Sequence, residues 1–403
     1  MKNVTVLVLS FMYPNFVRKN MGVFIHNQVK ALKDSGCNVV VIAPVPWRPR
    51  LLRWRKKWQI YKKISQREWV DGIDVFHPRY FRPRGGNWVY CWEGMAMYMG
   101  IKRVIKEVSK IYDFDLIHAN RIIPDGYAGI LLGKKFRVPV VSVARGSDTY
   151  EVPFKNRLNY IAARNVLKES DQLAAVSGQL ARIMTSIGRP KSQIKVVHNA
   201  CDTNRFRYMG GRNLIREKVG LSQRRLVILF VGTIHKKKGI YELLDAFNNL
   251  RDHNKHIFLV LIGEGKSTSQ LKVTIEKRGL QNCVKLTGYI PNDRMQLWYN
   301  SADIFVLPTY HEGTPNVVVE AMACELPVVA TDVGGIPEIL SDGKTGIIVK
   351  PRDASGLANA LDRLINDAKL RRMLGKNGRR FVEEELTWET NASELIKVYE
   401  SVM

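Results

Sequence analysis

The stretch PTYHEGTPNVVVEAMACELPVVATDVGGIPEIL, from Pro308 to Leu340, decides the fold of the chain. It follows an apolar run that ends at Leu307, and it contains a second apolar run, PVVATDVGG. Between the runs, a loop with Glu312 leads through Pro315, a residue suited to helix entry, into a helix that begins near Asn316. Strand, loop, helix and strand in this order predict a parallel α/β sheet.

The start of this helix is a candidate anion site. We expect the N–H groups of Asn316, Val317 and Val318 to be free and to face the strand ends, where they suit a phosphate or sugar hydroxyls. Glu312 in the loop and Glu320 eight residues later can both point into one cleft. The alternative is a capped helix with a core face, and these residues alone leave both interpretations open.

A basic loop precedes this stretch in the sequence VGTIHKKKG, Val231 to Gly239. Its strand ends at Gly232, and a helix follows Gly239. The three lysines 236–238 beside a helix N-terminus are unfavourable for the helix dipole, so we expect an anion such as a diphosphate to offset them. A solvated basic loop is the alternative.

The strand and helix patterns recur along the chain and predict two α/β units of similar size. NVTVLVLSF, MGVFIHNQVKALKDSG and NVVVIAP read as strand, amphipathic helix and strand, and RLVILFVGTI opens the second block. We place the boundary in IKVVHNACDTNRF, which gives residues 1–198 and 199–386. The last segment, 387–403, is predicted to be a helix that packs back on the first unit.

The composition is that of an ordinary globular protein. Of the 403 residues, 45% are hydrophobic, and no apolar run approaches the ~18 residues needed to span a bilayer. The five cysteines are scattered and form no Cys-x-x-Cys pair, which argues against a disulfide framework or a zinc site and favours a reducing cytosol.

The net charge of +26 is unevenly distributed. Residues 1–200 hold 34 Lys and Arg against 13 Asp and Glu, whereas residues 201–403 hold 29 against 24. This asymmetry indicates an acidic partner for the first half, such as nucleic acid, an anionic membrane surface or a charged substrate. Charge for solubility alone is the alternative.

The stretch RPRLLRWRKKWQIYKK, from Arg48 to Lys63, concentrates that charge beside aromatic residues. Drawn as a helix, four residues cluster within about 80° of arc, namely Leu51, Trp54, Trp58 and Tyr61. An aromatic stripe with basic flanks is typical of an interfacial helix. Contact with an acceptor glycan and a plain solvated helix are the alternatives. The residues predicted to contact a membrane are Arg53, Trp54, Arg55, Lys56, Lys57 and Trp58.

These motifs together resemble the glycosyltransferases of family 4, among them bacterial cell-envelope polysaccharide enzymes. The Glu-x7-Glu motif EGTPNVVVE carries the resemblance, and VGTIHKKKG, LIGEG, LTGYI, NACDTNRF, DLIHAN and ARGSD support it in the expected order. The resemblance implies a GT-B fold of two Rossmann-like domains with parallel sheets facing across a cleft. The N-terminal domain would bind the acceptor and the C-terminal domain the nucleotide sugar.

The resemblance also implies roles in the C-terminal domain. Glu312 would lie by the donor sugar, Glu320 would bind the ribose, and Lys238 would neutralise the departing diphosphate. Thr233 stands where the family usually has an arginine, and Lys236 and Lys237 offer replacement charge. The remaining implied donor contacts are Tyr289, Ile290, Gly313, Asn316, Val317 and Val318.

In the N-terminal domain, the resemblance implies that Gly22 approaches the diphosphate through its backbone, although Met21 replaces a second glycine. Asn120, which stands where the family often has a histidine, would contact the donor sugar, and His118 would support it; a buried structural histidine is the alternative for His118. Arg145 would bind an anionic acceptor group or pair with Asp148. Both are predicted acceptor residues.

The implied reaction is a retaining, metal-independent hexosyl transfer from a UDP- or GDP-sugar to a lipid-linked or polysaccharide acceptor at the cytoplasmic membrane face. No other cofactor is expected. An epimerase of the same fold is one alternative. A basic protein that binds nucleic acid or membranes without catalysis is another, but we find no nucleic-acid reader motif, so we expect no nucleic-acid partner.

Overall fold

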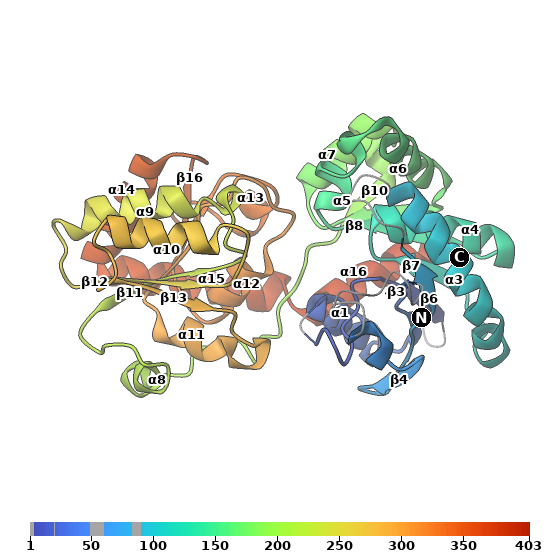
Figure 1. Cartoon of the computed structure of the whole chain (residues 1–403), viewed down its shortest axis with the longest axis horizontal. Helices are drawn as coiled ribbons and strands as arrows, with labels where there is room; N and C mark the ends of the chain where they lie inside the picture. The colour runs from blue at the N-terminus through green and yellow to red at the C-terminus, as the bar shows by residue number, and fades with distance from the viewer. Residues whose placement is uncertain (1–3, 20, 49–59, 83–89) are drawn as a thin grey trace. The chain divides into compact units, whose positions relative to one another are not determined.

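The computed structural model describes residues 4–19, 21–48, 60–82 and 90–403. The chain divides into two compact units, one formed by Met1–His198 with Trp388–Met403 and the other by Asn199–Thr387 (Figure 1). We describe each unit by itself. The predicted membrane-contact residues, Arg53 to Trp58, lie outside the described residues.

The N-terminal unit contains an eight-stranded sheet with the order β10-β9-β8-β7-β1-β2-β5-β4. Neighbouring strands are parallel except for the antiparallel pair β4 and β5. The strands are β1 (Thr5–Leu9), β2 (Asn38–Ile42), β4 (Arg67–Val70), β5 (Ile73–Phe76), β7 (Leu116–Ala119), β8 (Val140–Ala144), β9 (Gln172–Ala175) and β10 (Ile194–Val196). Most of them are continuous apolar runs, as expected for parallel strands that are covered on both faces.

Helices surround this sheet, and a two-stranded parallel sheet of β3 (Val45–Trp47) and β6 (Arg79–Phe81) lies beside it. The α-helices are α1 (Val23–Asp34), α3 (Tyr90–Ile111), α4 (Tyr127–Phe136), α5 (Ser147–Tyr150), α6 (Arg157–Glu169), α7 (Gly178–Ile187) and α16 (Trp388–Glu400). Helix α16 returns from the end of the chain and packs on α1 and β9.

The C-terminal unit contains a six-stranded, fully parallel sheet with the order β13-β12-β11-β14-β15-β16. The strands are β11 (Leu226–Val231), β12 (Ile257–Ile262), β13 (Val284–Gly288), β14 (Ile304–Leu307), β15 (Val328–Thr331) and β16 (Ile347–Val349). Figure 1 shows α9, α10 and α14 on one side of this sheet and α11 on the other.

The helices of the C-terminal unit alternate with its strands along the chain. They are α8 (Arg212–Lys218), α9 (Ile240–Arg251), α10 (Thr268–Lys277), α11 (Met295–Ser301), α12 (Asn316–Ala323), α13 (Ile336–Ile339), α14 (Ala354–Asn366) and α15 (Ala368–Glu385). The predicted helix start near residue 316 and the predicted α/β class with parallel sheets are confirmed. In the described residues, no helix is long and apolar enough to cross a bilayer.

Each sheet has a point where the strand order reverses, between β1 and β7 in the N-terminal unit and between β11 and β14 in the C-terminal unit. Ligands of open parallel sheets bind outside the carboxyl ends of the strands at such points. In the N-terminal unit, the loops at this point contain Gly22 and Asn120. In the C-terminal unit, they are residues 232–239 and 308–315.

Candidate active site

The two loops at the reversal point of the C-terminal unit are bound to each other. The backbone N–H of Tyr310 donates to the carbonyl of Lys237 at 2.9 Å. Gly239 ends the basic loop with φ +66°, and a Cβ atom there would lie 1.9 Å from the carbonyl oxygen of Pro308. Only a glycine fits this approach, which holds the lysine-rich loop against the end of β14.

This contact brings two predicted catalytic residues together. Nζ of Lys238 donates to Oε1 of Glu312, and the two side chains are 26% and 15% exposed. The loop of residues 308–315, which contains Glu312, is also held on its other side, because the N–H of Gly335 donates to the carbonyl of Gly313 at 2.6 Å. A cation and a carboxylate thus stand together at the point where the fold places ligands.

Glu320 lies on α12, the helix that follows the loop with Glu312, and a tyrosine from α11 fixes its carboxylate. The hydroxyl of Tyr299 donates to Oε2 of Glu320 at 2.7 Å. Burial raises the pKa of Glu320, while the hydrogen bond from Tyr299 opposes the shift. Tyr299 was not predicted, because only the fold brings residue 299 beside residue 320.

The start of α12 differs in one respect from the prediction. The N–H of Val318 donates to the carbonyl of Pro315 at 3.1 Å, so the prediction that this group is free is wrong. The cause is a tight first turn, and the Val318 side chain is fully buried in the core. The N–H groups of Asn316 and Val317 have no intrahelical acceptor and the helix has no side-chain cap, so both face outward from its N-terminus.

The other predicted donor residues lie at the same carboxyl edge of the sheet. Thr233 is exposed after β11. Tyr289, half exposed, and Ile290 follow β13, and the N–H of Tyr289 lies 3.4 Å from Oε1 of Glu264 after β12. Glu264 was not predicted as a site residue, although the LIGEG motif contains it.

In the N-terminal unit, Gly22 precedes α1 in the loop that follows β1. Its φ is +71°, and a Cβ atom there would lie 1.8 Å from the carbonyl oxygen of Met12, so the loop folds closely on itself. Helix α1 has no side-chain cap at its N-terminus. The N–H of Ile25 donates to the carbonyl of Gly22 at 2.9 Å, so the N–H groups of Val23 and Phe24 are the ones that remain available to an anion.

His118 lies at the end of β7 and is held by the C-terminal helix. Its Nδ1 atom is 2.6 Å from the hydroxyl of Tyr399, and the imidazole is fully buried. Burial, together with the nearby charge of Arg145, lowers the pKa of His118 to about 3, so the ring is neutral. No other acceptor for the Tyr399 hydroxyl is found in the described residues, so it donates to Nδ1. The hydrogen then resides on Nε2, for which no hydrogen bond of acceptable geometry is found in the same part of the chain, although Asn120 lies close enough to oppose the lowering of the pKa of His118.

Asn120 and Arg145 belong to a series of hydrogen-bonded side chains that, like the contact of His118, reaches α16. The guanidinium of Arg145 donates to Oδ1 of Asn120 at 2.5 Å and to Oε1 of Gln28. Gln28 donates to Asn391 at 2.7 Å, and Asn391 donates to the carbonyl of His198 at 2.5 Å. Burial lowers the pKa of Arg145 to about 10, which leaves it charged at neutral pH. Nδ2 of Asn120 has no partner among the described residues.

The surroundings of Asp148 differ from those expected of a residue that contacts the acceptor. Its carboxylate is fully buried and accepts the N–H groups of Ile122 at 2.9 Å, Gly146 at 2.8 Å and Arg145 at 3.3 Å. The prediction that Asp148 contacts an acceptor is therefore disfavoured, because its oxygens already organise the loops after β7 and β8. We assign it a positioning role.

Among the described residues, no group of three His, Cys, Asp or Glu side chains is placed to hold a metal ion. The sequence contains one Asp-x-Asp pattern, Asp113 to Asp115. It lies at the opposite edge of the sheet, where Oδ2 of Asp115 accepts the N–H of Thr5 at 2.8 Å.

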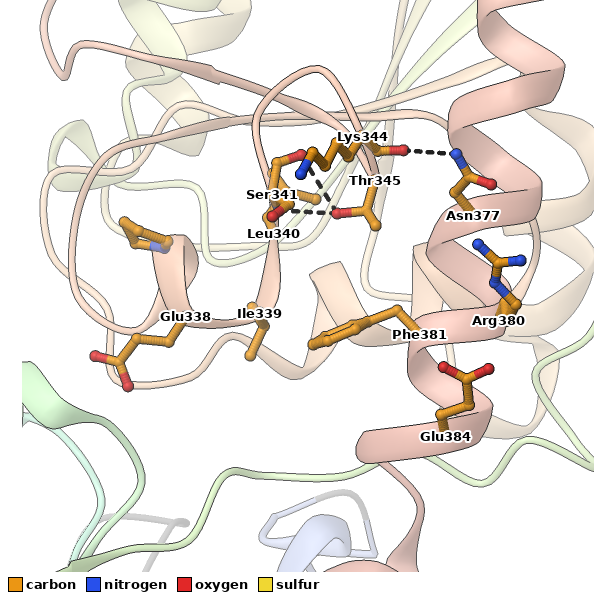
Figure 2. A pocket seen from close by; sticks show the side chains of 11 residues that line it. Glu338, Ile339, Leu340, Ser341, Lys344, Thr345, Asn377, Arg380, Phe381 and Glu384 are labelled. Atoms are coloured by element: carbon orange, nitrogen blue, oxygen red, sulfur yellow. Dashed lines mark hydrogen bonds between the residues drawn. The ribbon is translucent and has the colours of Figure 1, made fainter.

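A hollow of about 340 Å³ is formed by α13, the segment after it and α15 (Figure 2). The carbonyl of Lys344 accepts a hydrogen bond from Asn377 at 3.0 Å across it. Its charged side chains balance, because Lys344 and Arg380 are matched by Glu338 and Glu384.

Comparison with known proteins agrees with this geometry. Residues 21–205 match the model of Glycosyltransferase Family 4, and residues 211–381 match that of Glycosyl transferases group 1. The putative teichuronic acid biosynthesis glycosyltransferase TuaC of Bacillus subtilis is 29% identical over 89% of this chain and 88% of its own length.

Two solved structures share the whole fold. Sucrose-phosphate synthase from Thermosynechococcus elongatus superposes with a TM-score of 0.82 at 20% identity, over 99% of this chain and 98% of that one. Anabaena Alr3699/HepE in complex with UDP-glucose superposes with a TM-score of 0.74 at 19% identity, over 98% of this chain and 99% of that one. Fold and site thus define a glycosyltransferase of the GT-B type. In its N-terminal half the chain is similar to Glycosyltransferase Family 4, and in its C-terminal half to Glycosyl transferases group 1.

Proposed function

We propose that the protein transfers a sugar from a UDP- or GDP-type nucleotide sugar to a lipid-linked or polysaccharide acceptor in cell-envelope polysaccharide biosynthesis. The observation that carries the proposal is the Lys238–Glu312 pair at the strand-order reversal point, with Glu320 on the next helix. The UDP-glucose complex of HepE supports the donor class, and the similarity to TuaC, a putative teichuronic acid biosynthesis glycosyltransferase, supports the pathway class.

In the proposed reaction, the bond between the sugar C1 and the diphosphate oxygen breaks, and a bond between C1 and the acceptor oxygen forms on the same face of the sugar. The acceptor proton passes to the departing diphosphate. Lys238 exchanges its contact with Glu312 for the developing phosphate charge, and the free N–H groups of Asn316 and Val317 add to that stabilisation. This chain supplies the needed charge by itself, so we propose that no metal or further cofactor takes part.

The N-terminal unit is proposed to orient the reacting groups. Neutral His118 donates from Nε2 to a hydroxyl of the donor sugar, and Asn120 donates from Nδ2 to another. Arg145, charged and fixed by Gln28 and Asn120, attracts an anionic group of the acceptor. Gly22 and the start of α1 offer backbone N–H groups to the diphosphate.

A nucleotide-sugar panel tests this function. UDP- and GDP-sugars are incubated with the protein and a lipid-diphosphate or oligosaccharide acceptor, with and without EDTA, and nucleoside diphosphate release is measured. The expected result is release with one donor that depends on acceptor and survives EDTA, and a product with retained anomeric configuration by NMR. Failure to bind or turn over any donor refutes the proposal, and an epimerised nucleotide sugar without transfer favours the epimerase alternative.

We further propose that the protein works at the cytoplasmic face of the membrane. Trp47 and Phe81, paired in register on β3 and β6, are 40% and 46% exposed, and Ile60 is 45% exposed. Single exposed apolar residues are ordinary, but Trp47 and Ile60 flank the basic, aromatic segment 49–59 in the sequence, Phe81 pairs with Trp47, and all three lie in the strongly cationic half of the chain.

Sedimentation with vesicles that contain anionic lipid tests the membrane proposal. Neutralising Arg53, Arg55, Lys56 and Lys57 to glutamine should release the protein from the vesicles, and Trp47→Ser with Phe81→Ser should weaken binding independently. Vesicle binding that both variants leave unchanged contradicts membrane association while leaving the transfer reaction untouched.

A further inference from the structure

We propose that the C-terminal unit has a second site, separate from the donor site, that binds the phosphate or carboxylate group of an anionic sugar. The site is a hollow of about 340 Å³ on the outside of this unit. It is lined by Tyr208, Arg212, Asp303, Glu325, Pro327, Ala368, Arg371, Arg372 and Lys376.

The hollow lies at the opposite edge of the sheet from the donor loops. Asp303 immediately precedes β14 and Pro327 immediately precedes β15, whereas Glu312 follows the carboxyl end of β14. The four residues of β14 separate the two edges by about 13 Å at the usual rise of a strand. An anion in this hollow is therefore not the diphosphate proposed to bind at Lys238.

The hollow holds more positive than negative charge. Four cationic and two acidic side chains line it, and one of the two carboxylates is already shared. Oδ1 of Asp303 accepts from Arg212 at 2.7 Å, while Oδ2 accepts from Arg216 at 2.5 Å and from the N–H of Val227 at 2.7 Å. Since Arg216 does not line the hollow, Asp303 and Glu325 together leave at least two cations uncompensated.

The uncompensated cations come from the first turns of α15. In the described part of the chain, no carboxylate lies within ion-pair distance of Arg371, Arg372 or Lys376. Arg372 and Lys376 are four residues apart on one helix face, where like charges repel. Burial lowers the pKa of Arg371; the charge of Asp303 opposes this shift, and the charges of Arg212 and Arg372 add to it. An anion bound in the hollow would offset both the repulsion between Arg372 and Lys376 and the unfavourable burial of the Arg371 charge.

Two further features define the ligand. Helix α15 begins at Ala368 in the wall of the hollow, where the side chain of Asp367 caps the N–H of Leu370 at 2.8 Å and offsets part of the positive helix end. Tyr208 is 50% exposed and offers an aromatic face beside the cations, which suits the apolar face of a sugar ring. The hollow in Figure 2 is of the same size but balanced in charge, so an excess of cations is not a general property of hollows on this unit.

Titration calorimetry at constant ionic strength tests the proposal with the full-length protein. The probes are inorganic phosphate, glucose 6-phosphate and a glucuronate oligosaccharide, and the variant is Arg372→Ala with Lys376→Ala, two exposed residues. We expect saturable binding to the parent protein and binding about tenfold weaker in the variant, since each exposed cation near an anion contributes a few-fold. The better of the two sugar probes then identifies a phosphate or a carboxylate as the natural group.

Two controls keep the test specific. Lys272→Ala with Lys277→Ala removes the same charge from the exposed face of α10 and should leave binding unchanged. Lys238→Ala should also leave it unchanged, because that lysine belongs to the donor loops. Equal binding by the parent and the Arg372–Lys376 variant, loss of binding in Lys238→Ala, or binding of duplex nucleic acid in place of all three probes overturns the proposal.

Discussion

Replacing Lys238 by alanine should abolish most of the transfer activity while leaving the fold intact. Lys238 and Glu312 are 26% and 15% exposed, so their ion pair is partly solvated and contributes about 0–1 kcal/mol to stability. In the reaction, the lysine faces charge that develops on the departing diphosphate. Removing one preorganised group of this kind costs about 10²–10³ in kcat, or ~2.7–4 kcal/mol.

The loss should fall mainly on kcat, because in the ground state Lys238 must give up Glu312 to reach the diphosphate. Steady-state assays of nucleoside diphosphate release, with unfolding followed in parallel, measure both effects. Lys272→Ala is the matched control, because it removes an exposed lysine of the same unit, on α10 away from the donor loops, and should keep activity within about twofold. If Lys238→Ala stays within threefold of the parent enzyme, or if Lys272→Ala loses as much, the assigned role of Lys238 is wrong.

Three further predictions concern Tyr399, Gly239 and Asp125, the last of which follows β7 and accepts the N–H of Phe11 at 3.2 Å. Tyr399→Phe should cost about 1 kcal/mol of stability and shift His118 away from the Nε2–H tautomer, seen by 15N NMR; an unchanged tautomer contradicts the assignment. Burial raises the pKa of Asp125 to about 8, whereas it is about 4 in the unfolded chain. The folded state therefore binds more protons between these pH values. The free energy of unfolding should fall by up to ~1.4 kcal/mol for each pH unit as the pH rises from 4 to 8. Denaturation at several pH values should show this slope flattened in Asp125→Asn, and an equal slope refutes it. Gly239→Ala should lose at least ~1–2 kcal/mol of stability and most activity, because its Cβ atom would collide with the Pro308 carbonyl; a variant as stable as the parent contradicts the close approach.

Much of the fold follows from the sequence because parallel strands are continuous apolar runs that alternate with helices. The resemblance assigned Lys238 and Glu312 to one site, and the two side chains do lie together because the carboxyl ends of β11 and β14 share one edge. The free N–H predicted at Val318 failed because the backbone of the first turn closed on Pro315, and such a turn has no distinct residue signature.

The supporting contacts could not be predicted because they join distant parts of the chain. Gln28 and Asn391 are 363 residues apart, and only the return of α16 to α1 pairs them. Tyr399 reaches His118 by the same return. The buried setting of Asp148 also depends on two neighbouring loops, whereas its sequence context, ARGSD, reads equally well as a ligand site or a structural cap.

A crystal structure of the protein with the nucleotide sugar that it turns over most rapidly tests the central claim most directly. The account predicts a diphosphate within hydrogen-bond distance of Nζ of Lys238 and a ribose hydroxyl on the carboxylate of Glu320. A nucleotide bound with its diphosphate away from the 232–239 and 308–315 loops would contradict it.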